Sequence, residues 1–184
     1  MTETKRTFSG LLTRRLTYSA LFLAIALVLP FLTGQIPEIG SMLCPMHIPV
    51  LLCGFLCGWP WGLAVGFLAP LLRSVLFGMP PMVPTAVAMA FELAVYGAAS
   101  GFLYRRLPRK KASVYIALLV AMVLGRVVWG VVRVILAGLA GSSFTWALFL
   151  SGAITTAIPG IILQIVLIPI LVIALEKAGL SLNQ

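Results

Sequence analysis

Long apolar runs are the feature that most constrains this chain. Six such runs fill most of its 184 residues, 61% of which are hydrophobic and 9% charged. A soluble domain of this size cannot bury so much apolar surface, whereas membrane helices expose it to lipid. We therefore expect an all-α integral membrane protein in which residues 1–184 form one domain, a single bundle of six transmembrane helices.

The apolar runs predict spans joined by short loops. These spans cover residues 16–33, 47–58, 63–77, 84–104, 114–139 and 147–175. The basic segment 1–15 is expected to form a short amphipathic helix on the cytoplasmic surface. The short second and third spans predict a hairpin with a turn at 58–62, and Pro159, Gly160 and Pro169 are expected to break the sixth span.

Positive charge is distributed unevenly along the chain. The formal net charge is +9, and most basic residues lie within 5–15 and 105–111, beside apolar spans. The predicted loop 34–46 contains Glu38 and no Lys or Arg. Basic loops stay in the cytoplasm, so both termini are predicted to be cytoplasmic. Basic residues confined to span ends do not form a nucleic-acid stripe, and no nucleic-acid partner is expected.

Motifs for catalysis are missing from the sequence. The chain has one histidine and four acidic residues, and it shows no Ser-His-Asp set, metal-ligand cluster, phosphate-binding loop or dinucleotide fingerprint. Cys44, Cys53 and Cys57 are expected to pack as small side chains. We therefore expect no enzyme activity, no catalytic residue, no cofactor and no metal, and ATP hydrolysis by this chain is excluded.

Ionisable side chains within the spans are the main candidates for function. Arg73, Glu92, Arg126 and Arg133 lie inside apolar spans, and His47 begins the second span. With both termini inside, all five fall in the outer half of the bundle. Such residues are costly in a membrane and usually functional, so we predict that they bind substrate.

The fifth span carries a candidate binding stripe. Arg126 and Arg133 lie seven positions apart and share a face, with Trp129 and Gly130 between them. Guanidinium groups bind carboxylate or phosphate, and an indole ring offers stacking. The stripe is predicted to grip a flat or anionic ligand. The alternatives are that Arg133 reaches the outer headgroups and that Trp129 faces lipid.

The fourth and sixth spans add polar groups to the predicted site. Met89, Glu92 and Tyr96 share a helix face by their spacing, and Gln164 is an isolated amide in an apolar span. Buried polar groups need hydrogen-bond partners. Tyr96 and Gln164 are therefore predicted to contact the substrate or a neighbouring helix.

Structural roles are the alternatives for two of these residues. Glu92 is an acid that can pair with Arg126 or Arg73 to hold the bundle together, and His47 can cap the start of its helix. One acid within the spans cannot neutralise three arginines. The remaining positive charge predicts an anionic group on the ligand.

Several short segments match a known family in their positions along the chain and in their combination. They are Ala20 and Ala24 in the first span, Met46–Leu52 (MHIPVLL) with Gly54 and Gly58, Gly78–Pro81 (GMPP), and Phe91–Gly97 (FELAVYG). On these residues, and over essentially its whole length, the chain resembles the substrate-binding S components of energy-coupling factor (ECF) vitamin transporters.

The resemblance implies a mechanism. An S component captures a vitamin or related molecule from outside the prokaryotic cell membrane and docks on a membrane scaffold subunit through a face that includes Ala20 and Ala24. Two ATPase subunits drive the assembly, and the S component topples to release its cargo. The family site lies on the outer side, which places Met79 at the pocket and makes the loop 34–46 and the turn 78–84 its gates.

The substrate is the least determined part of this expectation. The arginine excess favours a small anionic vitamin, with pantothenate as first choice, and a pyridoxine-like or hydroxymethylpyrimidine-like compound or a larger cofactor precursor is also compatible. The alternatives are an autonomous transporter or channel, an intramembrane enzyme using Glu92 and His47, and a metal-uptake S component. A metal-uptake S component would use a free amine next to the histidine as a metal ligand. Met46 is internal and has no free amine, so metal uptake is disfavoured, although Cys44 offers a soft ligand.

Overall fold

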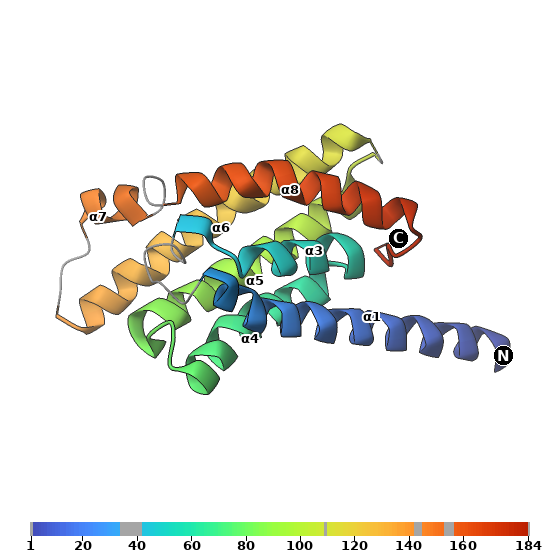
Figure 1. Cartoon of the computed structure of the whole chain (residues 1–184), viewed down its shortest axis with the longest axis horizontal. Coiled ribbons are helices and arrows are strands. Elements are labelled where there is room, and N and C mark those ends of the chain that lie inside the picture. The colour runs from blue at the N-terminus through green and yellow to red at the C-terminus, as the bar shows by residue number, and fades with distance from the viewer. Residues whose placement is uncertain (1, 34–41, 109, 142–144, 153–156, 184) are drawn as a thin grey trace.

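The computed structural model describes residues 2–33, 42–108, 110–141, 145–152 and 157–183, and the regular elements in these ranges are all helical (Figure 1). They are α1 (Thr2–Val28), η1 (Leu29–Thr33), α3 (His47–Cys57), α4 (Trp59–Phe77), η2 (Met82–Ala86), α5 (Val87–Arg106), α6 (Lys111–Leu139), α7 (Trp146–Leu150) and α8 (Ile158–Lys177). Five helical stretches are long and apolar enough to cross a membrane, and α3 is a shorter apolar helix. The prediction of an all-helical membrane protein is confirmed.

Helix α3 forms the centre of the bundle. All of its residues except Ile48 are buried, and it packs against α1, α4, α5 and α8. At about 1.5 Å per residue its 11 residues are about 16 Å long, roughly half of a bilayer core of about 30 Å. An apolar helix this short can lie at membrane depth because the surrounding helices cover it.

Glycines bring α4 and α5 into close contact. A Cβ at Gly97 would collide with the backbone of Gly62, and a Cβ at Gly66 would collide with the backbone of Leu93. Small residues allow the two helix backbones to approach in this way. The contact fixes the position of α5, which carries Glu92.

The N-terminal helix differs from its prediction. A separate amphipathic helix over 1–15 was expected, but α1 is one continuous helix from Thr2 to Val28. Gly10 is the single glycine in its first half, which has no proline, and the apolar Leu11 and Leu12 follow it directly. One glycine costs a helix only about 1 kcal/mol, so the helix continues into the membrane span.

Two predicted interruptions also lie elsewhere. The turn expected at 58–62 consists of Gly58 alone, whose φ of 102° reverses the chain, and Pro60 lies in the first turn of α4, where proline is tolerated. The sixth span is divided between α7 and α8, Pro159 lies in the first turn of α8, and α8 continues through Pro169. Prolines at helix starts have therefore been mistaken for breaks.

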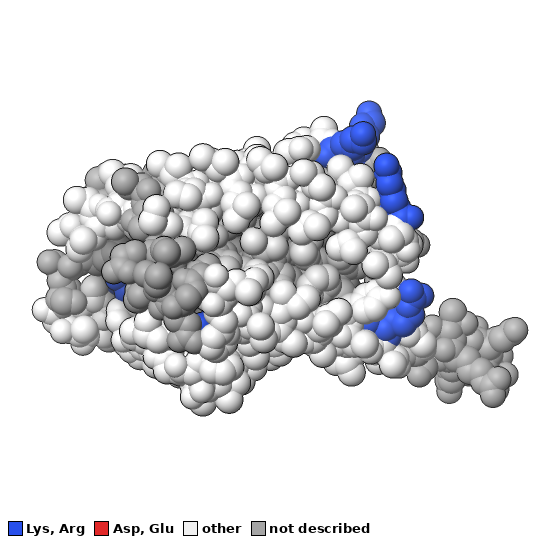
Figure 2. All heavy atoms as spheres, viewed as in Figure 1, with Lys and Arg blue, Asp and Glu red and all other residues white. Residues whose placement is uncertain are grey.

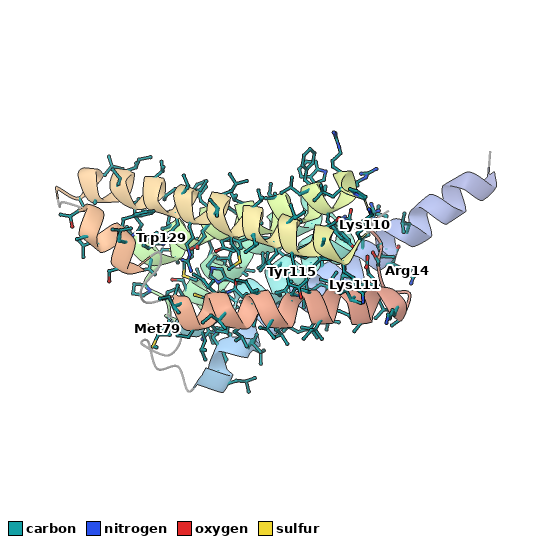
Figure 3. All side chains as sticks on the ribbon, turned by 90° about the horizontal axis from the view of Figure 1, so that it is seen from above. Arg14, Met79, Lys110, Lys111, Tyr115 and Trp129 are labelled. Carbon is teal, nitrogen blue, oxygen red and sulfur yellow. The ribbon has the colours of Figure 1, made fainter. Side chains whose placement is uncertain are left out.

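The two ends of the bundle differ in charge. Figure 2 shows basic side chains gathered at one end, and Figure 3 places Arg14, Lys110 and Lys111 there, opposite Met79 and Trp129. Both termini lie at the basic end (Figure 1). Because basic segments remain in the cytoplasm, this end faces the cytoplasm and the other end faces outward.

Candidate functional site

A buried carboxylate lies at the centre of the candidate site. Glu92 on α5 is 1% exposed, and its Oε1 lies 2.8 Å from Nη1 of Arg126 on α6 and 3.5 Å from Nε2 of His47 on α3. Two helices, α3 and α6, therefore bring charged or ionisable groups to one carboxylate oxygen of α5. Of the two pairings expected for Glu92, the pair with Arg126 is the one that forms.

Tyr96 and Cys44 complete this cluster. The rings of His47 and Tyr96 meet edge to face with centroids 5.0 Å apart, and Nη2 of Arg126 lies 3.7 Å from Sγ of Cys44. A Cβ at Gly125 would collide with the Tyr96 ring, so a glycine is required where this ring packs between α5 and α6. Tyr96 was predicted, whereas sequence reasoning assigned Gly125 no role and left Cys44 as a packing residue or soft ligand.

Several polar atoms near this depth have unused hydrogen-bonding capacity. Among the described residues, buried polar atoms without a hydrogen-bond partner include Nδ1 of His47, Nε of Arg126 and Oε1 of Gln164. Gln164 is 1% exposed and lies on the face of α8 that packs into the bundle. Leaving such atoms unsatisfied costs about 1–3 kcal/mol each. A polar ligand offering both donors and acceptors would recover part of that cost.

A second group of residues joins α6 to α7. The guanidinium of Arg133 lies 5.7 Å from the ring centroid of Trp129, and the Trp129 and Phe149 rings are 6.2 Å apart. A Cβ at Gly130 would collide with Phe149, and a Cβ at Gly152 would collide with Trp129. Each ring thus packs against a glycine of the opposite segment. The space beside Gly130, in the predicted binding stripe, is occupied by Phe149.

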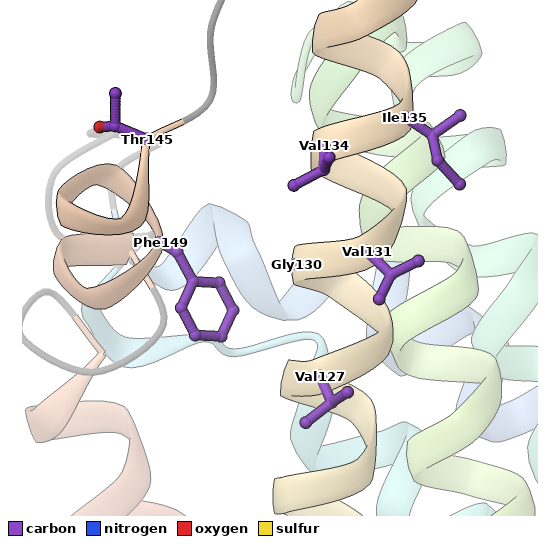
Figure 4. A pocket seen from close by; sticks show the side chains of 7 residues that line it. All are labelled: Val127, Gly130, Val131, Val134, Ile135, Thr145 and Phe149. Atoms are coloured by element: carbon purple, nitrogen blue, oxygen red, sulfur yellow. The ribbon is translucent and has the colours of Figure 1, made fainter.

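An apolar cavity of about 470 Å³ is lined by residues of α6 and of the α7 segment (Figure 4). Its lining residues are Val127, Gly130, Val131, Val134, Ile135, Thr145 and Phe149. Thr145 supplies the one side-chain hydroxyl in this lining, so the cavity suits an apolar group and not a charged one. Neither Glu92 nor Arg126 lines the cavity, and its lining residues Val127, Val131 and Val134 are exposed on the surface of α6.

A comparison of the sequence with known protein families identifies the family of this chain. The family model described as "ECF transporter, substrate-specific component" matches residues 14–172. This chain belongs to that family. It is therefore a subunit of a prokaryotic cell-membrane transporter, not an enzyme, and it works with an ECF energizing module. No match to a curated protein or to a solved structure was found.

The S-component fold is a bundle of six membrane helices. In this S component the short helix α3 accompanies the five membrane-length stretches. The family assignment does not identify the substrate.

Arg73 of the S component lies in different surroundings from the Glu92 cluster. Its Nη1 donates to the carbonyl oxygen of Leu27, and its guanidinium lies 4.8 Å from the ring centroid of Phe31 and 5.5 Å from that of Phe77. These contacts join η1 and the end of α1 to the outer end of α4. The structure therefore gives Arg73 a helix-joining role in addition to its predicted contact with substrate.

The predicted gates are only partly described. Met79 is half-buried in the segment between α4 and η2, at the same end as Trp129 (Figure 3). In the loop 34–46, positions 34–41, including Glu38, lie outside the described residues. Met42 and Leu43 pass so close to α8 that a Cβ at Gly160 would meet their backbone. The outer end of α8 is thus covered by this segment.

The small residues of α1 lie on its outer surface. Ala20 and Ala24 are exposed, and so are their neighbours Leu21 and Ile25. Just 22% of the membrane span that includes these residues is buried within the S component. Most of α1 is therefore available to lipid or to another membrane protein.

Proposed function

We propose that this S component captures a small anionic vitamin or vitamin precursor at the outer half of the bundle. The observation that carries the proposal is the set of buried polar groups that converge from α3, α5 and α6. Arg126 binds Glu92 through one terminal nitrogen and keeps its Nε–H without a hydrogen-bond partner among the described residues. An acceptor on the ligand would complete the guanidinium, which prefers carboxylate or phosphate oxygens.

The charge of the outer half supports an anionic ligand. Its spans carry Arg73, Arg126 and Arg133 but one acid, Glu92. Positive charge is therefore in excess within these spans. Ionisable groups at membrane depth need compensation, and a ligand carboxylate would supply it.

Pantothenate is the first choice among anionic vitamins. It combines a carboxylate with an amide and hydroxyl groups, which match the unsatisfied acceptor Oε1 of Gln164 and the ring nitrogens of His47. The apolar cavity between α6 and α7 would receive the aliphatic part of such a molecule. A pyridoxine-like or hydroxymethylpyrimidine-like compound, or a larger cofactor precursor, would instead use the rings of Trp129 and Phe149.

Release of the cargo is assigned to the energizing module. We place the contact with its membrane scaffold subunit on the face of α1 that includes Ala20 and Ala24, because small exposed side chains allow close helix approach. Two ATPase subunits then supply the energy, and the S component topples in the membrane. The loop 34–46 and the turn 78–84 act as gates over the site.

The first experiment identifies the ligand. Native mass spectrometry of the S component, purified from its own membrane, should reveal a bound compound of vitamin size that carries a carboxylate or phosphate. A bound compound that is neutral or basic would contradict the charge argument. The identified compound then serves as the probe for titration.

The second experiment tests the residues. Gln164→Leu and Arg126→Ala should each weaken binding of that compound by at least about tenfold, because each variant removes a buried polar contact. Arg105→Ala removes an exposed cytoplasmic arginine and should bind as the parent does. Unchanged affinity in both site variants would place the ligand elsewhere. Thermal unfolding of each variant separates loss of binding from loss of fold.

A further inference from the structure

Helix α8 ends in a motif that turns the chain back toward the bundle. Gly179 has a φ of 73°, its N–H donates to the carbonyl oxygen of Glu176 at 2.9 Å, and the N–H of Leu180 donates to that of Leu175 at 3.0 Å. This pair of bonds is a Schellman motif, which requires a left-handed residue that glycine adopts without strain. Residues 180–183, here called the C-terminal strap, therefore run back under the helices.

The strap is hydrogen-bonded to two central helices. The N–H of Leu182 donates to the carbonyl oxygen of Leu56 at 2.7 Å, and Nδ2 of Asn183 donates to that of Gly101 at 3.1 Å. Both strap residues are buried. Leu56 lies in the last turn of α3, whose carbonyl groups have no partner within the helix. The strap thus satisfies a backbone carbonyl group at the cytoplasmic end of α3 and adds a hydrogen bond to one of α5.

Glycines make the space for this contact. A Cβ at Gly101 would collide with the backbone of Gly54 and Gly58, and a Cβ at Gly58 would lie 3.3 Å from Oδ1 of Asn183. Gly58 has a φ of 102°, which other residues rarely adopt. A polar side chain can therefore enter between α3 and α5 at this point and reach their backbones.

The strap also holds α1. Nη2 of Arg15 donates to the carbonyl oxygen of Leu182 at 2.6 Å. Successive helix residues are separated by roughly 100°, so Arg15 lies about 140° around the helix from Ala20 and about 180° from Ala24. Arg15 therefore contacts the strap from the face of α1 that lies opposite to Ala20 and Ala24. In Figure 1 the first half of α1 extends beyond the other helices, at the end of the molecule where the C-terminus also lies.

We infer that Arg15 and Asn183 are positioning residues that fix the cytoplasmic half of α1 for docking on the energizing module. The inference rests on the proposed docking role of Ala20 and Ala24. With the strap in place, α1 is connected through Leu182 and Asn183 to α3 and α5. Without it, the cytoplasmic half of α1, next to Ala20 and Ala24, loses this connection and is held only through the packing of the other half against α3 and α4.

The test compares matched variants of the full chain in lipid nanodiscs. Arg15→Met and Asn183→Ala each remove strap hydrogen bonds, and Arg14→Met removes the adjacent exposed charge as a control. Hydrogen exchange over residues 10–19 should accelerate about fivefold in the two strap variants, the factor expected for one lost hydrogen bond. It should stay unchanged in Arg14→Met. Arg15→Lys, which keeps a donor, should be intermediate.

Docking is measured separately, by the amount of co-expressed energizing module that co-purifies with each variant. We expect less module with Arg15→Met and Asn183→Ala and the parental amount with Arg14→Met. Unchanged exchange in both strap variants would show that the strap does not hold α1. Faster exchange with undiminished module would show that this order is irrelevant to docking, and either result overturns the inference.

One further variant separates the inference from the proposed function on which it rests. Ala20→Leu enlarges the proposed docking face without touching the strap. If Ala20→Leu retained the parental amount of module, the docking face itself would be wrong. The exchange result would still report on the strap, so the two failures are distinguishable.

Discussion

The ion pair between Glu92 and Arg126 combines a stability problem with the binding function that we propose for it. Glu92 is almost fully buried, and the guanidinium that neutralises it is the same group that we assign to the ligand. Removing one partner of a buried pair leaves an uncompensated charge, which is far worse than removing both. A substitution of one partner should therefore lower the stability of the protein, whereas substitution of both partners should leave it nearly unchanged.

Glu92→Gln should destabilise the S component by about 3–5 kcal/mol, because Arg126 then stays buried without a carboxylate. Unfolding followed by tryptophan fluorescence in detergent would measure the loss.

The paired variant Glu92→Leu with Arg126→Met is the control for this prediction. It should be close to the parent in stability and should fail to bind the compound that co-purifies with the parent. A paired variant as unstable as Glu92→Gln would show that the charges themselves are not what holds the helices.

Part of the candidate site could be predicted from residue types alone. Glu92, Arg126 and His47 stand out because charged or ionisable groups are rare in apolar spans, and the structure brings them together. Arg73 satisfied the same criterion yet contacts a carbonyl group and two aromatic rings. Which arginine meets the carboxylate depends on how the helices are rotated, and that is not encoded locally. Gly125 was missed because its importance comes from a ring on another helix.

At the scale of elements, the contact between α4 and α5 orients the helix that carries Glu92. Gly66→Ala should destabilise the protein by about 1–3 kcal/mol, because the added methyl group collides with the backbone of Leu93 and forces the helices apart. Differential scanning fluorimetry would detect the lower unfolding temperature.

Gly138 provides the matched control for this contact. It lies in α6, and a Cβ there meets no atom within 4 Å. Gly138→Ala should stabilise the protein by about 0.5–1 kcal/mol, since alanine is the better helix former. Equal effects of the two substitutions would mean that helix propensity, and not the close contact, decides the result.

The presence of each helix was easier to predict than the residues at which it begins and ends. Length and apolarity identified all the membrane-length stretches because the bilayer sets the length of its helices. The continuous α1 and the start of α4 at Trp59 were missed. A proline has opposite meanings at the first turn of a helix and within it, and a sequence does not say which of the two applies.

At the scale of the whole molecule, the asymmetry of basic residues fixes the orientation. A cysteine replacing Gly138, in the outer part of α6, should react in intact cells with a maleimide that does not cross membranes. A cysteine replacing the exposed Lys110 should react only after permeabilisation. The native Cys44, Cys53 and Cys57 are buried and should contribute little background. The opposite labelling pattern would invert the topology.

Transport should require the complete assembly. The S component alone in liposomes should bind its co-purified compound without accumulating it, because the chain contains no nucleotide-binding motif that could supply energy. Liposomes that also contain the energizing module and ATP should accumulate the compound. Accumulation by the S component alone would indicate an autonomous transporter.

The shortness of α3 has a consequence for the path of the cargo. His47 begins this helix and Gly58 follows its other end, so the two are separated by about 16 Å, roughly half the thickness of the hydrocarbon core. A solute held beside His47 would therefore be about 16 Å from the cytoplasmic end of α3. Its remaining route is blocked by packed side chains and by the strap at Gly58, and not by a long distance. The energy of the ATPases would then be used to open a short, closed exit.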